Sequence, residues 1–204
     1  EYIESTSFAD RAYMPAKNEV ERVLFALFVE KKSFRKCKDW QEVIAKLKSL
    51  DRTNFDKLSR EFEAIISTFW GLMTYRGWRD LHRMGFCTHR RGLINPVYGF
   101  YQYDKPAPAI LQQKFAAVHA LNNNLYKLMM AQKVPGNLAE YPLALGNIIP
   151  FTVGGNLRQW EFCNWQRSKP SVNHEVRQSF LKIEKGLRQH YPWWSEISRA
   201  DTTP

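Results

Sequence analysis

Two arginine-rich segments carry the residues best suited to chemistry. The first runs from Arg76 to Arg91 and contains five arginines and two histidines. Guanidinium groups hold phosphate through paired hydrogen bonds, so this density favours an anion site. The segment crosses the predicted end of a helix, where the helix dipole also favours cations. A phosphate site, a solvated basic loop and plain capping of the helix all fit this pattern.

The second segment runs from Asn156 to Arg167 and follows a glycine pair, Gly154-Gly155. We expect a helix to begin at Asn156. A helix amino terminus presents free N–H groups to an anion, and glycines let a ligand approach the backbone. The alternative is that Arg158 and Arg167 are surface charges in ordinary salt bridges.

Other chemistries have little support in the sequence. There is no glycine-rich nucleotide motif, no Ser-centred nucleophile motif and no zinc-protease motif. His82 and His89 are seven residues apart, which is not a metal-ligand spacing by itself. Cys37, Cys87 and Cys163 are odd in number and widely spaced, so we expect reduced thiols and no metal.

Composition indicates one folded domain with a strongly basic surface. The chain has 204 residues, 44% hydrophobic and 14% aromatic, with a net charge of +10. That charge suits nucleic acid, an anionic membrane or a phosphorylated small molecule, and a plain solvated surface fits it too. No apolar run is long enough to span a membrane and no signal peptide is evident, so we expect a cytoplasmic protein without a membrane partner.

Apolar periodicity predicts an α+β fold, mostly helical, with a small sheet in a single domain over residues 1–204. Residues 1–16 are expected to be irregular, 84–109 to be loops and turns, and 98–103 to form a short strand or an aromatic loop. Residues 148–153 are the best strand candidate. The predicted helices cover residues 17–32, 39–49, 53–83, 109–132, 156–167 and 171–191.

At the two arginine-rich segments, the chain resembles the flavin-dependent thymidylate synthase family. The resemblance covers roughly residues 55–195 and is strongest over 139–177. The segment from Ile148 to Arg158 resembles the family's strand leading into Asn-x-Arg. The helix ending at Arg167, and the later Glu175-Val-Arg177, resemble the family's carboxyl-terminal motif.

The resemblance implies a flavoprotein of nucleotide biosynthesis that binds FAD and a pyrimidine deoxynucleotide. Family members transfer a methylene group from methylenetetrahydrofolate to deoxyuridylate, with NADPH as reductant, and assemble as homo-tetramers. The resemblance therefore predicts a homo-oligomer or a related partner subunit. It assigns FAD contacts to Asn156, Arg158, Arg83 and Thr88, and nucleotide contacts to Arg90, Arg91 and Arg167.

The chain departs from the family's Arg-His-Arg-x-x-Ser signature, which this comparison places at residues 83–88. Met84 and Gly85 stand where the family has His and Arg, and Glu140 stands near a family arginine. Losing a cation removes charge complementarity to phosphate. The amino-terminal part of the family fold is also short here. Two hypotheses therefore stand side by side. The chain is a divergent flavin-dependent methyltransferase, or it is a degenerate subunit of the same fold.

A nucleic-acid-binding module is the third hypothesis. Basic loops and the aromatic residues Tyr98, Phe100, Tyr101 and Tyr103 could stack bases. No RNA-binding aromatic signature and no helix-turn-helix pattern supports it, so nucleic acid is the least favoured partner. The long apolar helix predicted over residues 53–83 and this aromatic segment are the grounds in the residues for expecting an oligomer.

Overall fold

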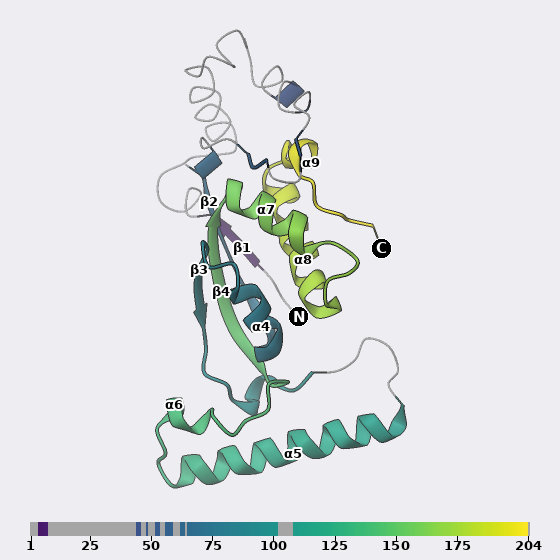
Figure 1. Ribbon diagram of the computed structural model, residues 1–204. Helices are drawn as coiled ribbons and strands as arrows, with labels where there is room; N and C mark the ends of the chain where they lie inside the picture. The colour runs from purple at the N-terminus through teal and green to yellow at the C-terminus, as the bar shows by residue number, and fades with distance from the viewer. Residues whose placement is uncertain are drawn as a thin grey trace. The chain divides into compact units, whose positions relative to one another are not determined.

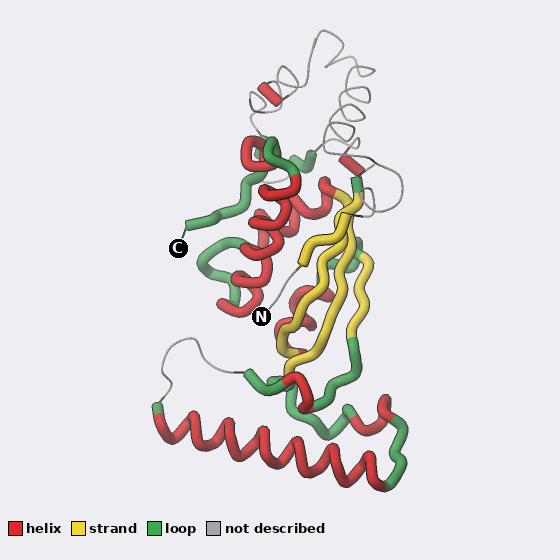
Figure 2. Tube along the Cα trace, turned by 180° about the vertical axis from the view of Figure 1, so that it is seen from behind, coloured by secondary structure: helices red, strands yellow, loops and turns green. Residues whose placement is uncertain are grey.

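The computed structural model describes residues 4–7, 44–45, 48, 52–53, 56–58, 62–63, 65–101 and 108–203. Its strands form a four-stranded sheet in the order β1-β2-β4-β3 (Figures 1 and 2). The strands are β1 (Glu4–Ser7), β2 (Ile66–Thr74), β3 (Thr88–Arg91) and β4 (Ile148–Asn156). The helical segments are α4 (Tyr75–His82), η2 (Pro96–Tyr98), α5 (Ala109–Ala131), α6 (Gly136–Ala139), α7 (Leu157–Arg167), α8 (His174–His190) and α9 (Trp194–Ile197). Helices combined with one small sheet confirm the predicted α+β class.

The chain divides into two compact units. The first, called the α5 unit, contains Trp70–Arg83 and His89–Thr152. The second, called the α7–α8 unit, contains Ile3–Phe69, Met84–Thr88 and Val153–Pro204. Strands β2, β3 and β4 each have residues in both units. The predicted single domain over residues 1–204 stays a prediction.

A small apolar cluster forms the core of the α5 unit. Ile94, Leu143 and Ile149 are its buried members. Burying such side chains stabilises a fold by roughly 1.5–3 kcal/mol each. Half-buried side chains of α4 and α5 pack against the cluster, namely Tyr75, Trp78, Tyr126 and Met129.

The α7–α8 unit has a larger aromatic core. The Trp160 ring of α7 lies edge-on to Phe69 of β2, with ring centroids 4.9 Å apart. The Trp160 indole N–H donates to the Ser67 carbonyl at 3.0 Å, so the ring is buried without losing its hydrogen bond. The fully buried Glu184 carboxylate of α8 accepts from the Trp194 indole N–H at 3.0 Å, which holds α9 against α8.

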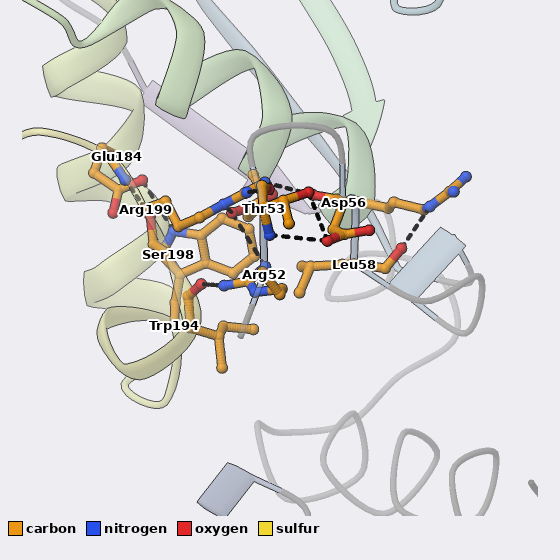
Figure 3. A network of polar contacts seen from close by, with 12 residues as sticks. Arg52, Thr53, Asp56, Leu58, Glu184, Trp194, Ser198 and Arg199 are labelled. Atoms are coloured by element: carbon orange, nitrogen blue, oxygen red, sulfur yellow. Dashed lines mark hydrogen bonds and ion pairs between the residues drawn. The ribbon is translucent and has the colours of Figure 1, made fainter. Parts of the chain in front are cut away.

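A buried carboxylate fixes the chain that follows α9. Glu161 of α7 is fully buried, and its carboxylate accepts from Arg199 at 2.7 and 3.0 Å and from Arg52 at 3.2 Å. Arg199 also donates to the backbone carbonyls of Thr53 and Asp56, both at 2.8 Å (Figure 3). Burial lowers the pKa of the Arg52 guanidinium. Since a buried carboxylate needs compensating charge, the two arginines stabilise Glu161 and join distant segments of the unit.

The prediction of one long helix over residues 53–83 is wrong. Residues 66–74 form strand β2, and α4 begins only at Tyr75. Along β2 burial alternates, with Ser67, Phe69, Gly71 and Met73 on the buried face. The Thr74 side chain accepts from the Gly77 N–H at 2.9 Å and so starts α4 after the strand.

Several other predicted elements are confirmed. Helix 109–132 is α5, and strand 148–153 is β4, which continues to Asn156. Asn156 precedes α7, and the final helix is α8. The helix predicted over residues 171–191 begins later, because Asn173 directly precedes α8.

Other predictions were incomplete, or lie outside the described residues. Irregular structure over 1–16 is wrong at β1, and the loop region 84–109 contains β3. In segment 98–103, Phe100 forms an isolated antiparallel bridge with Asn147, and residues 102–103 are not described. Helix 17–32 lies outside the described residues, and of helix 39–49 only residues 44–45 and 48 are described, as helical.

Candidate functional site

Helix α4 carries a ring-bearing face and a basic face. Tyr75, Trp78 and His82 recur at steps of three and four residues, and their rings stack with centroids 5.8 and 4.6 Å apart. His82 also lies 5.2 Å from His89 of β3, so the fold brings together two histidines seven residues apart. The basic face carries the exposed side chains of Arg76, Arg79 and Arg83.

Strand β3 presents its residues alternately. Thr88 and Arg90 are exposed, whereas His89 and Arg91 are half-buried. Arg90 is therefore placed to meet a ligand from solvent. Arg83, at the end of α4, is also accessible, since 71% of its side chain is exposed and its Asp80 contact is long, at 3.7 Å. An exposed pair of this length contributes little and leaves Arg83 able to bind an anion.

Arg91 is engaged inside the α5 unit. Its two terminal nitrogens donate to the Glu140 carboxylate at 2.8 and 2.9 Å. The guanidinium also lies over the rings of Tyr75 and Trp78, 4.9 and 5.6 Å from their centroids. The hydrogen bonds from Arg91 lower the pKa of Glu140, and the same bonds raise the pKa of Arg91. The charge reversal at Glu140 thus has a partner, and the paired donors of Arg91 are occupied.

The two residues that open α7 are also engaged within the protein. The Asn156 side chain accepts from the Gln159 N–H at 2.9 Å, and the Gln159 side chain accepts from the Asn156 N–H at 2.8 Å. This reciprocal pair is a capping box that begins the helix. Arg158 donates to the Leu58 carbonyl at 2.6 Å and to Glu63 at 2.7 Å. The Asn156 side-chain oxygen, and the Nε and one terminal nitrogen of Arg158, are thus used in hydrogen bonds within the protein.

Arg167, in the last turn of α7, differs from these residues. It is half-buried, and its Nε is buried with no hydrogen-bond partner among the described residues. A buried guanidinium N–H without an acceptor is costly and needs an explanation. An anionic ligand would supply the missing acceptor.

A pair of buried thiols lies one turn before Arg167. Cys87 and Cys163 are free, buried and hydrogen-bonded to each other. That bond lowers the pKa of Cys87, and together with burial it raises the pKa of Cys163. Cys37 lies outside the described residues. The sequence analysis missed this pairing, because 76 positions separate the two cysteines.

Cationic side chains lie over rings on the surface of the α7–α8 unit. The Lys57 ammonium lies 4.8 Å from the centroid of the Phe162 ring. Lys169 and Arg199 lie 4.1 and 4.8 Å from the Trp165 ring. Aromatic faces attract cations in this way, and of the three cations only Lys169 is close to Arg167 in the sequence. Spacing along the chain did not indicate these contacts.

A second stretch, residues 88–93, also matches part of the signature that the resemblance places at residues 83–88. Thr88-His89-Arg90-Arg91-Gly92-Leu93 keeps the His and the second Arg of Arg-His-Arg-x-x-Ser and lies on β3. At the earlier position, Met84 and Gly85 lie in the turn after α4. Successive side chains of a strand point to opposite faces of the sheet. The residues of β3 have this regular alternation, and Met84 and Gly85 in the turn do not.

The aromatic segment supports base stacking less well than predicted. Tyr98 is exposed. The Phe100 ring instead packs near Phe115 and His119 of α5, with centroids 6.3 and 5.7 Å away. Tyr103 lies outside the described residues.

The described part of the chain shows neither a metal site nor a membrane-spanning helix. No group of three or more His, Cys, Asp or Glu side chains could hold a metal ion there. None of the described helices combines the length and apolar character needed to cross a membrane.

Comparisons with known proteins show the fold. No protein-family model matches the chain, and no curated protein sequence matches it. Among solved structures, the chain is similar to PolB from Streptomyces cacaoi, a UMP/dUMP methylase bound with 5-Br dUMP. The TM-score is 0.68 at 13% sequence identity, and the match covers 98% of this chain and 97% of that chain. The chain therefore has a PolB-like fold over nearly its whole length.

Proposed function

We propose that this chain is a pyrimidine nucleotide methylase of the flavin-dependent thymidylate synthase type. Arg167 carries the proposal, because on a PolB-like fold it has a buried Nε for which the described part of the chain supplies no acceptor. In this proposal the nucleotide phosphate accepts from Arg167. Arg83, Arg90 and Thr88 are exposed, and they remain candidate anion contacts of their own units.

The proposed reaction replaces the hydrogen at C5 of the uracil base by a methyl group. The methylene carbon of methylenetetrahydrofolate forms a bond to C5 while both of its bonds to folate nitrogens break. The two nitrogens take up two protons, of which the proton lost from C5 balances one and solvent supplies the other. NADPH supplies the hydride that completes the methyl group, and tetrahydrofolate and NADP+ leave. Bound FAD would relay these reducing equivalents. The Asn156 side-chain oxygen and the Arg158 guanidinium make hydrogen bonds within the protein, so Arg83 in the α5 unit and Thr88 in the α7–α8 unit are each a separate candidate FAD contact, taken in its own unit.

A degenerate subunit of the same fold is the second candidate. The observation that favours it is the internal use of Arg91, Asn156 and Arg158, three of the seven predicted ligand contacts. Such a chain would bind nucleotide yet need a related subunit to complete the reaction. A homo-oligomer and a cytoplasmic location remain parts of the first proposal.

A product assay separates the two candidates. The protein is incubated with UMP or dUMP, FAD, NADPH and methylenetetrahydrofolate labelled at the methylene carbon. The methylase proposal predicts label in the nucleotide at C5, measured by mass spectrometry. Nucleotide binding without label transfer would contradict the methylase and support the degenerate subunit.

A further inference from the structure

Cys87 and Cys163 come from two segments that the fold of the α7–α8 unit brings together. Cys87 directly precedes β3, and its N–H donates to the Met84 carbonyl at 2.8 Å. Cys163 lies in the middle of α7 and is fully buried, whereas 8% of Cys87 is exposed. Both are free thiols, and they are hydrogen-bonded to each other. The reaction proposed above uses neither of them.

The turn that carries Cys87 is held against one face of α7. The Gln159 side-chain amide donates to the Phe86 carbonyl at 2.6 Å, and the Phe86 and Phe162 rings lie 6.0 Å apart. Gln159, Phe162 and Cys163 are separated by three and four residues from the first, so they share a face of the helix. That face therefore receives Phe86 and Cys87 together, and the two sulfurs meet as part of a fixed contact.

The glycine before α7 leaves room for the Cys87 sulfur. A Cβ atom at Gly155 would lie 3.1 Å from the Cys87 Sγ, which is closer than ordinary van der Waals contact. The sulfur thus lies against the backbone where β4 leads into α7. On the other side of Cys87 along the chain, Gly85 and Phe86 are exposed. Cys87 is therefore held close to Cys163 and lies one residue from a part of the turn that solvent reaches.

The two thiols differ in acidity. The hydrogen bond with Cys163 lowers the pKa of Cys87 against the opposing effect of burial, and the same bond together with burial raises the pKa of Cys163. Cys163 is therefore the donor of the hydrogen bond, and Cys87 is the thiol that ionises first. The positive charges of Arg167 and Lys57 also act on the pair through Cys163. Reactive cysteines are found in such electropositive surroundings, often beside a second cysteine that resolves the first oxidised product.

We propose that Cys87 and Cys163 are an oxidisable dithiol, which a peroxide converts into an intramolecular disulfide. The Cys87 sulfur attacks one oxygen of hydrogen peroxide, the O–O bond breaks, and a sulfenic acid and one water form. The Cys163 sulfur then attacks the Cys87 sulfur, the S–O bond breaks, and the hydroxyl group leaves with the Cys163 proton as a second water. The two thiols lose two electrons in total, and these electrons reduce one peroxide to two waters.

The disulfide would tie the turn before β3 covalently to α7. Its two ends are next to Thr88 and one helical turn before Arg167. A cytosolic disulfide of this kind is transient, and a thiol reductant reverses it by exchange. The proposal concerns the oxidation of the two sulfurs and does not depend on the methylase reaction.

The mass and thiol content of the oxidised protein test the proposal. The parent for the experiment is Cys37→Ser, which removes the third thiol. After treatment with hydrogen peroxide, the parent should lose the mass of two hydrogen atoms and both thiols that react with maleimide after unfolding. Dithiothreitol should restore both thiols. Peptide mapping without reductant should link Cys87 to Cys163 within one chain.

Single variants of the same parent separate the roles of the two sulfurs. Cys163→Ser should stop at the Cys87 sulfenic acid, which dimedone traps. Cys87→Ser should keep Cys163 reduced under the same conditions, because that thiol is fully buried and stays protonated. Circular dichroism checks that both variants fold, and the parent experiment stands whether or not they do. Two thiols that survive peroxide in the parent, or a disulfide only between chains, would overturn the proposal, whatever the result of the methylase assay.

Discussion

Arg91 and Glu140 show how a change that looks damaging in the sequence can be structural. Near an expected arginine the chain has Glu140, whose carboxylate accepts two hydrogen bonds from Arg91 and one from the Ile94 N–H at 3.0 Å. The pair is mostly shielded from solvent, with 23% and 14% of the two side chains exposed. Arg91 therefore positions β3 in the α5 unit, and anion binding is left to other arginines.

Glu140→Gln should destabilise the protein by about 1–3 kcal/mol at neutral pH, because Arg91 loses its ionic acceptor. The pKa of Glu140 is lowered in the folded protein, relative to about 4.3 in the unfolded chain. The pair thus contributes its full stability above about pH 4, and this contribution is lost as the pH falls through the lowered pKa. Urea unfolding at several pH values measures the difference.

Glu63→Gln is a suitable control for this experiment. Glu63 is also paired with an arginine at 2.7 Å, but its side chain is 39% exposed. Exposed pairs contribute little, so at neutral pH the control should cost less than Glu140→Gln, and the difference should shrink as the pH falls through the lowered pKa of Glu140. A Glu140→Gln protein as stable as the wild type at pH 7 would show that the pair does not stabilise the unit.

The sequence predicted arginines as ligand contacts but could not show which of them were free. Arg158 and Arg91 find acceptors 95 and 49 positions away, in Glu63 and Glu140. Such long-range pairs depend on the fold, and no local spacing encodes them. That the buried Nε of Arg167 has no acceptor among the described residues likewise became visible only in the structure.

At the scale of elements, the most informative error is the helix predicted where strand β2 lies. Both of its faces carry apolar residues, with Phe69 and Met73 buried and Ile66 and Trp70 exposed. Their positions also match the three- and four-residue steps of a helix, so periodicity misled the prediction. The run of β-branched and aromatic residues in Ile66–Thr74 was the signal that favoured a strand. In contrast, α5 and α8 were predicted correctly, because their stripes extend over many turns.

The stability of Asn156 variants tests whether this side chain caps helix α7. Asn156→Ala removes the acceptor for the Gln159 N–H and should destabilise the protein by about 1 kcal/mol. Asn156→Ser can still cap the helix and should restore most of that loss. Thermal unfolding of both variants measures this, and equal loss in the two would contradict a capping role.

At the scale of the whole molecule, the chain shares a fold with PolB although few of the residues are identical. The PolB-like fold covers nearly the whole chain at 13% identity. A fold can be kept by apolar patterning and a few buried polar contacts, such as those of Glu161 and Glu184. Ligand binding needs particular side chains, so the fold alone does not decide the reaction.

The central claim is that the chain binds a pyrimidine nucleotide through Arg167, and calorimetric titration with UMP and dUMP tests it most directly. Arg167→Ala should weaken binding about tenfold or more, since hydrogen bonds to charged groups are worth about 1.5–3 kcal/mol. Lys185→Ala removes one positive charge from an exposed position on α8 and should leave the affinity unchanged. Thermal unfolding confirms that each variant is folded. No binding by the wild type, or equal affinity of wild type and Arg167→Ala, would contradict the claim.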